Sequence, residues 1–156
     1  MPEKIYVGDL ESLVENKKVE GKQLKIGNEN FYKISNVDKM RPFFMSIVSN
    51  SNHWMFISST GSLSAGRKNS EFSLFPYYTD DKITESSDTT GSKTIIIVKI
   101  NNKNFLWEPF SSRYKGAYKV SRNIYKNTIG NKVIFEEVNH DLNVEFSYQW
   151  LSLIHI

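Results

Sequence analysis

The sequence LNVEFSYQW, at residues 142–150, alternates apolar and polar side chains without a break. Successive side chains of a β-strand point to opposite faces, so this period of two predicts a strand with one buried face. We expect the exposed face to carry Glu145, because a register shift of one residue would bury that carboxylate. The side chains expected on the buried face are Leu142, Val144, Phe146, Tyr148 and Trp150.

Short segments rich in β-branched and aromatic residues recur upstream, between turn sequences such as GNEN at residues 27–30. Short strands at regular spacing predict an all-β, antiparallel β-sandwich rather than alternating strands and helices. Lys93–Ile100 is apolar without alternation, so we expect burial on both of its faces. A short helical turn is expected within residues 9–18, and the longest loop within residues 79–92. The other expected strands are 23–26, 31–37, 43–49, 53–58, 62–67, 71–78, 105–107, 117–127 and 132–139.

The length of 156 residues suits a single domain. We assign residues 1–20 to an N-terminal lead-in and residues 21–150 to the β-sandwich. The last six residues, LSLIHI at 151–156, resemble a translated sequencing adapter, and the alternation breaks at Leu151. We therefore expect an adapter artefact at 151–156 and a sandwich that is incomplete at its C-terminus, the N-terminal piece of a longer protein.

The composition excludes several classes of protein. Lys and Arg number 20 against 17 Asp and Glu, and this net charge of +3 is small for a nucleic-acid-binding protein. The absence of cysteine excludes a disulfide scaffold, a thiolate metal site and cysteine catalysis. The N-terminus lacks an export signal, and no apolar run is long enough to cross a bilayer. We expect a cytoplasmic protein with no nucleic-acid partner and no membrane partner.

The stretch between Glu108 and Glu136 is basic and contains several tyrosines, with no acidic residue. Basic residues interleaved with aromatic ones are typical of a nucleic-acid strip. The next strands, however, carry Glu137 and Glu145, and a hairpin would place the two signs opposite each other as cross-strand pairs. We favour the cross-strand interpretation.

No recognisable catalytic motif is present. The segment 61–66 (GSLSAG) resembles a nucleophile elbow only superficially, since neither Ser62 nor Ser64 has glycine on both sides at the required spacing. His53 and His140 do not have the spacing of a metal site, and no phosphate-binding glycine motif occurs. We therefore predict no catalytic residue, no metal ligand and no cofactor.

Aromatic, arginine and carboxylate residues in loop-edge segments form the best candidate ligand site. An aromatic ring packs against the apolar face of a sugar, while Arg and Asp hydrogen-bond to sugar hydroxyls. For Trp54, between Met55 and Phe56, core packing is the favoured interpretation, and for the adjacent aspartates a capped turn is the alternative. The candidate ligand-binding residues are Arg67, Tyr77, Tyr78, Asp80, Asp81 and Trp107.

The segment Pro42–Trp150 resembles the N-terminal β-sandwich of large carbohydrate-active enzymes of the cellobiose-phosphorylase type. A Trp-x-Pro element, Trp107-Glu108-Pro109, follows an aromatic loop and a short glycine hairpin in the order found in that family. The segments that carry the resemblance are FFMSIVS (43–49), HWMFISS (53–59), Gly61, AGR (65–67), FPYYTDD (75–81), LWEPF (106–110) and IFEE (134–137).

This resemblance implies a galactose-mutarotase-like supersandwich that precedes an (α/α)6 barrel in the same chain. In such enzymes the catalytic groups lie in the barrel, so the sandwich itself is expected to be inactive and to contact carbohydrate, the barrel or a second copy in a homodimer. The parent enzyme is expected to be a glycoside phosphorylase or hydrolase acting on β-linked oligosaccharides. The alternative is a stand-alone β-sandwich module that binds carbohydrate or protein.

Overall fold

The computed structural model describes residues 2–8, 17–49, 52–69, 71 and 93–152, without the side chain of Arg67. Within these residues the chain forms three β-sheets and a short helical turn, η1, at Val37–Lys39. The all-β, sandwich-like class expected from the sequence is confirmed. In the part of the chain that is described, no helix has the length and apolar character needed to cross a membrane.

The large sheet has five antiparallel strands in the order β11-β10-β9-β3-β2. The hairpin of β2 and β3 turns at Gly27, whose positive φ of 59° favours glycine. The expected strand at 132–139 matches β10 residue for residue. The strands of this sheet are β2 (Glu20–Ile26), β3 (Glu29–Ser35), β9 (Val120–Asn127), β10 (Lys132–Asn139) and β11 (Val144–Leu151).

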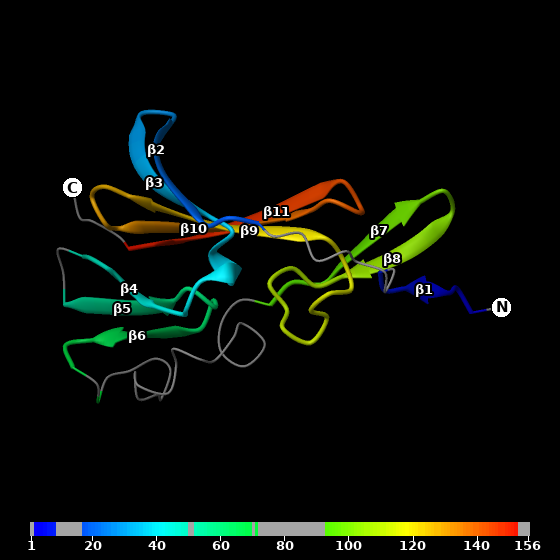
Figure 1. Cartoon of the computed structure of the whole chain (residues 1–156). Helices are drawn as coiled ribbons and strands as arrows, with labels where there is room; N and C mark the ends of the chain where they lie inside the picture. Colours follow the sequence, from blue (N-terminus) through cyan, green and yellow to red (C-terminus); the bar gives the residue numbers. More distant parts are fainter. Residues whose placement is uncertain (1, 9–16, 50–51, 70, 72–92, 153–156) are drawn as a thin grey trace.

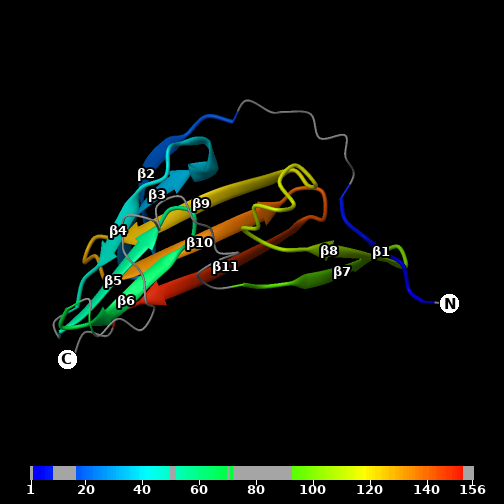
Figure 2. The same ribbon diagram turned by 90° about the horizontal axis from the view of Figure 1, so that it is seen from below.

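The small sheet is an antiparallel meander of β4 (Phe44–Ile47), β5 (His53–Ser58) and β6 (Leu63–Arg67). The end sheet pairs β7 (Ile96–Ile100) with β8 (Lys103–Trp107) through a turn in which Asn101 and Asn102 both have positive φ. The short strand β1 (Ile5–Tyr6) adds to β8 in parallel, which makes the end sheet mixed. Figures 1 and 2 show the small sheet against one half of the large sheet, and the end sheet beyond its other half.

Two apolar cores lie on the same face of the large sheet. The first core joins the large and small sheets around Ile57 and Val133, both 0% exposed. The second core joins the large sheet to the end sheet around Trp107 and Leu142. Phe146 packs against both cores, so the two are continuous along β11.

The register expected for the last strand is confirmed. Along β11, partly buried residues alternate with exposed ones, and Glu145 is exposed on the face opposite Phe146 and Tyr148. Burial also holds the pKa of the Tyr148 hydroxyl far above its usual range. Leu142 is buried as expected, but it lies in the turn before β11, and the strand continues through Leu151, which pairs with Lys132.

Two burial predictions are wrong. The strand β7 is not buried on both faces: Ile96, Val98 and Ile100 pack against the second core, while the opposite face leaves Ile97 56% exposed, beside Ile95 at 58%. Trp54 is not part of either core. It lies half-buried on the reverse face of the small sheet, 5.8 Å from the ring of Phe56, because Met55 and Ile57 take the inward positions of β5.

Candidate functional site

A buried carboxylate lies where the two cores meet. Side chains at every second position of β10 point into the interior, and these are Val133, Phe135 and Glu137. Glu137 is therefore an acid on the buried face of the strand. Glu137 is 1% exposed, and its partners across the sheet are Arg122 on β9 and Phe146 on β11. A charge at such a position is costly unless it is paired and hydrogen-bonded.

Three donors satisfy Glu137. The indole Nε1 of Trp107 donates to Oε2 at 2.7 Å, and the backbone N–H of Phe110 donates to Oε1 at 3.1 Å. The Nε of Arg122 donates to Oε1 at 2.6 Å and forms an ion pair with it. Trp107 belongs to the second core and Phe110 to the first core, so the carboxylate of Glu137 links the two cores.

The same network anchors the loop 108–119 on the face of the large sheet. Arg122 donates a second hydrogen bond, from Nη2 to the carbonyl of Ser111 at 2.9 Å. Phe110 has a φ of 62°, a left-handed conformation that is strained for a bulky residue. Its side chain is 8% exposed and its N–H is held by Glu137, which together offset that strain.

The other end of this loop closes against the N-terminal segment. Tyr118 donates its hydroxyl to the carbonyl of Leu106 at 2.5 Å, and burial raises the pKa of that hydroxyl. Gly8 has a φ of 57°, and a Cβ at this position would collide with the backbone carbonyl of Ala117. Only glycine therefore lets the segment lie directly against the loop.

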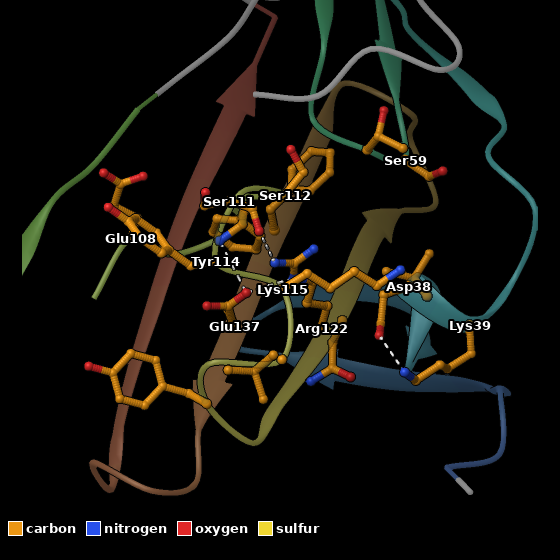
Figure 3. A pocket seen from close by; sticks show the side chains of 18 of the residues that line it. Asp38, Lys39, Ser59, Glu108, Ser111, Ser112, Tyr114, Lys115, Arg122 and Glu137 are labelled. Atoms are coloured by element: carbon orange, nitrogen blue, oxygen red, sulfur yellow. Dashed lines mark hydrogen bonds and ion pairs between the residues drawn. The ribbon is translucent and has the colours of Figure 1, made fainter. Parts of the chain in front are cut away.

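A cleft of about 650 Å³ opens between this loop, η1 and the start of β9 (Figure 3). Its floor includes Phe135 and the Arg122–Glu137 pair, while hydroxyl groups contribute to its lining. Hydroxyl side chains both donate and accept hydrogen bonds, which suits a ligand that carries hydroxyl groups. The hydroxyl residues that line the cleft are Ser59, Thr60, Ser111, Ser112, Tyr114 and Tyr118.

The cleft carries more positive than negative charge. Its lining among the described residues includes five cationic side chains and three acidic ones. Each acid is engaged by a cation: Asp38 by Lys39 at 3.3 Å, Glu108 by Arg113 at 3.5 Å and Glu137 by Arg122. The cationic lining residues are Lys17, Lys39, Lys115, Lys119 and Arg122.

The sequence-predicted ligand site is only partly within the described residues. Trp107 was expected at a loop edge, but it is the last residue of β8, is 2% exposed and donates to Glu137. A ring so fully enclosed offers no face to a sugar, so the role predicted for Trp107 is corrected to core packing. The residues of that site that lie outside the described part are Tyr77, Tyr78, Asp80 and Asp81, together with the side chain of Arg67.

Sequence reasoning did not identify the site built around Glu137 and Arg122. A signal was present, since Glu137 follows Val133 and Phe135 at the strand's period of two and so falls on the apolar face. One pair agrees with the cross-strand explanation of the basic stretch, because Arg122 faces Glu137 in the ladder and contacts it at 2.6 Å, whereas Glu145 faces Val138. What the sequence does not reveal is that this pair points inward.

Other candidate chemical groups are buried or dispersed. Ser62 and Ser64 are 0% and 1% exposed, so neither hydroxyl is accessible to a substrate. His140 lies 2.7 Å from the hydroxyl of Ser121, which also accepts a hydrogen bond from Lys17, at an exposed position. No group of three His, Asp or Glu suited to a metal ion occurs in the described part of the chain.

Comparison with known proteins gives no match for this sequence, either among protein-family models or among curated proteins.

Proposed function

We propose that this chain is a non-catalytic β-sandwich domain of a carbohydrate-active enzyme, and that the cleft beside loop 108–119 binds carbohydrate. The parent would be a glycoside phosphorylase or hydrolase that acts on β-linked oligosaccharides, with its catalytic groups in an (α/α)6 barrel. The observation that carries the proposal is a cleft of about 650 Å³ with a hydroxyl-bearing lining above a fixed polar floor. That volume lies within the range of small-molecule sites.

The state of the cleft's carboxylates favours binding over catalysis. Glycoside hydrolysis by a pair of carboxylates requires one acid that donates a proton and one that attacks or activates water. Glu137 is committed to Trp107, Phe110 and Arg122. Glu108 lies within ion-pair distance of Arg113 and Lys93, and Asp38 within that distance of Lys39. These contacts support a structural role for the three acids rather than a catalytic one.

The test is a titration of the ¹⁵N-labelled chain with cellobiose and cellotetraose, followed by NMR. We expect shifts in the amides of loop 108–119 and weaker binding in Ser112→Ala, which removes an exposed hydroxyl at the cleft. Loss of one hydrogen bond predicts a decrease of about 2-fold to 10-fold in affinity. Ser147→Ala is the matched control, because Ser147 is exposed on the outer face of β11. Shifts that are absent from the loop, or equal losses in both variants, would remove the proposal.

The stand-alone module remains the second candidate, favoured by one observation. Two continuous cores are already assembled among the described residues, around Ile57 and around Trp107. A sharp, cooperative thermal transition of the isolated chain as a monomer would support this candidate. A broad transition, with binding of an apolar dye before unfolding, would favour the accessory domain.

A further inference from the structure

We propose that the cleft selects acidic sugars, which carry a carboxylate, over neutral ones; this inference rests on the proposed function. The cleft joins hydroxyl groups, which suit the hydroxyls of a sugar, to the ammonium groups of Lys115 and Lys119, which have no acidic partner among the described residues and suit an anionic group.

Arg122 provides a fixed cation at the floor of the cleft. Two of its nitrogens are occupied, Nε by Glu137 and Nη2 by the carbonyl of Ser111. The structure gives its Nη1 no partner among the described residues, and the side chain is 25% exposed. A guanidinium that two contacts hold in place loses little conformational entropy when it binds a further anionic oxygen.

Lys115 provides a second cation from the loop that anchors on Glu137. It is exposed, and the described part of the chain supplies no carboxylate for its ammonium group. Figure 3 shows Lys115 with Arg122, Asp38 and Ser112 around the same pocket. Asp38 is engaged by Lys39 at 3.3 Å, and no ion pair joins it to Lys115.

Lys119 increases the positive charge at the cleft's edge. Its backbone N–H donates to Asp141 at 2.7 Å, while its side chain is half-buried and has no partner in the described residues. The three acids of the cleft are each neutralised by a cation, so Lys115 and Lys119 leave a net positive potential. A neutral sugar gains nothing from that potential, whereas a hexuronate carboxylate does.

The experiment compares D-glucuronate, D-glucose, acetate and inorganic phosphate on the full chain by NMR titration. We expect glucuronate to bind about 10-fold more tightly than glucose at low salt, and this advantage to shrink at about 0.5 M salt. Lys115→Gln is expected to reduce the advantage about 3-fold and Lys115→Arg to retain it. Lys25→Gln on β2, an exposed lysine that does not line the cleft, is the matched control and should change nothing.

The outcomes separate this inference from the proposed function. Equal binding of glucose and glucuronate overturns the inference and leaves carbohydrate binding in place. Acetate or phosphate binding as tightly as glucuronate also overturns it, since the cleft would then be a simple ion site. If glucuronate binds no more weakly in Lys115→Gln than in Lys25→Gln, the assignment of Lys115 is wrong. If no sugar binds, neutral or acidic, both proposals are overturned.

Discussion

Glu137 illustrates how one residue can organise a β-sandwich that contains two cores. Its carboxylate accepts a side-chain bond from Trp107, a backbone bond from Phe110 and a charged bond from Arg122. An apolar residue at this position would leave the indole N–H, the backbone N–H and the Nε of the guanidinium without this acceptor. Burying hydrogen-bond donors without an acceptor costs free energy, so an acid that accepts from all three is favoured over an apolar residue at this inward position.

The first prediction concerns Glu137→Gln. The amide keeps the size of the side chain but removes the charge, which leaves Arg122 beside a neutral group. We expect the free energy of unfolding to decrease by about 3 kcal/mol, the lower end of the range for a broken buried ion pair, because Arg122 is partly exposed. Urea unfolding measures this change. Glu145→Gln, on the exposed face of β11, should stay within about 0.5 kcal/mol of wild type, and a similar loss in both variants would contradict the assignment.

The second prediction concerns pH and Glu29. Its carboxylate accepts hydrogen bonds from Lys132 at 2.7 Å and from Asn127 at 3.3 Å, which together lower the pKa of Glu29 below its ordinary value. A folded-state pKa below the unfolded one adds stability that is present above the unfolded pKa and is lost as pH falls through the folded one. In Lys132→Met we expect an NMR titration to show the pKa of Glu29 rising towards its ordinary value. Lys22→Met, on β2, is the control and should leave the Glu29 titration unchanged. An unchanged titration in Lys132→Met as well would show that Lys132 does not lower the pKa of Glu29.

At the scale of the elements, the alternation of apolar and polar residues predicts where the strands lie. Which of their faces are buried depends on the packing of the sheets. The bounds of β5 and β10 follow from turn residues and β-branched runs, and both agree with expectation. The continuous apolar run at Lys93–Ile100 does not reveal whether one or both faces of the strand are covered, because that depends on long-range packing of the sheets. The prediction that Trp54 packs in the core is wrong because adjacent apolar residues in one strand point to opposite faces.

The candidate site was less predictable than the fold. The basic stretch and the following acidic strands correctly predicted cross-strand pairing, which Arg122 and Glu137 form. The cleft, however, is assembled from η1, loop 108–119 and β9, which are distant in sequence. Only tertiary packing brings such segments together, so composition within any one of them does not reveal the site.

The third prediction concerns the edge strand β7. Ile97 is 56% exposed on β7, whose outer edge pairs with no further strand among the described residues, a configuration that promotes association. We expect Ile97→Lys to reduce concentration-dependent association in sedimentation velocity. Lys99→Ile, two residues along the same face, should increase association, because it removes a charge that protects the edge. If neither variant changes the sedimentation profile, this edge does not mediate association.

At the scale of the whole molecule, the long strands of the large sheet hold the small sheet and the end sheet on one face. The first core lies between the large and small sheets, and the second lies between the large and end sheets. Phe146 contacts both cores, and Glu137 receives donors from both. This shared middle region predicts that the three sheets unfold together.

The final prediction tests that cooperation with Phe146→Ala. Because the ring is partly buried against both cores, we expect a loss of about 3 kcal/mol, the low end of the range for a buried phenylalanine. Native-state hydrogen exchange should then accelerate by the same factor in β5 of the small sheet and β8 of the end sheet, since both draw on one global unfolding event. Ser147→Ala, the neighbouring residue on the outer face, should leave both rates unchanged. Acceleration confined to one of the two strands would mean that the sheets open independently, and that the contact at Phe146 does not couple them.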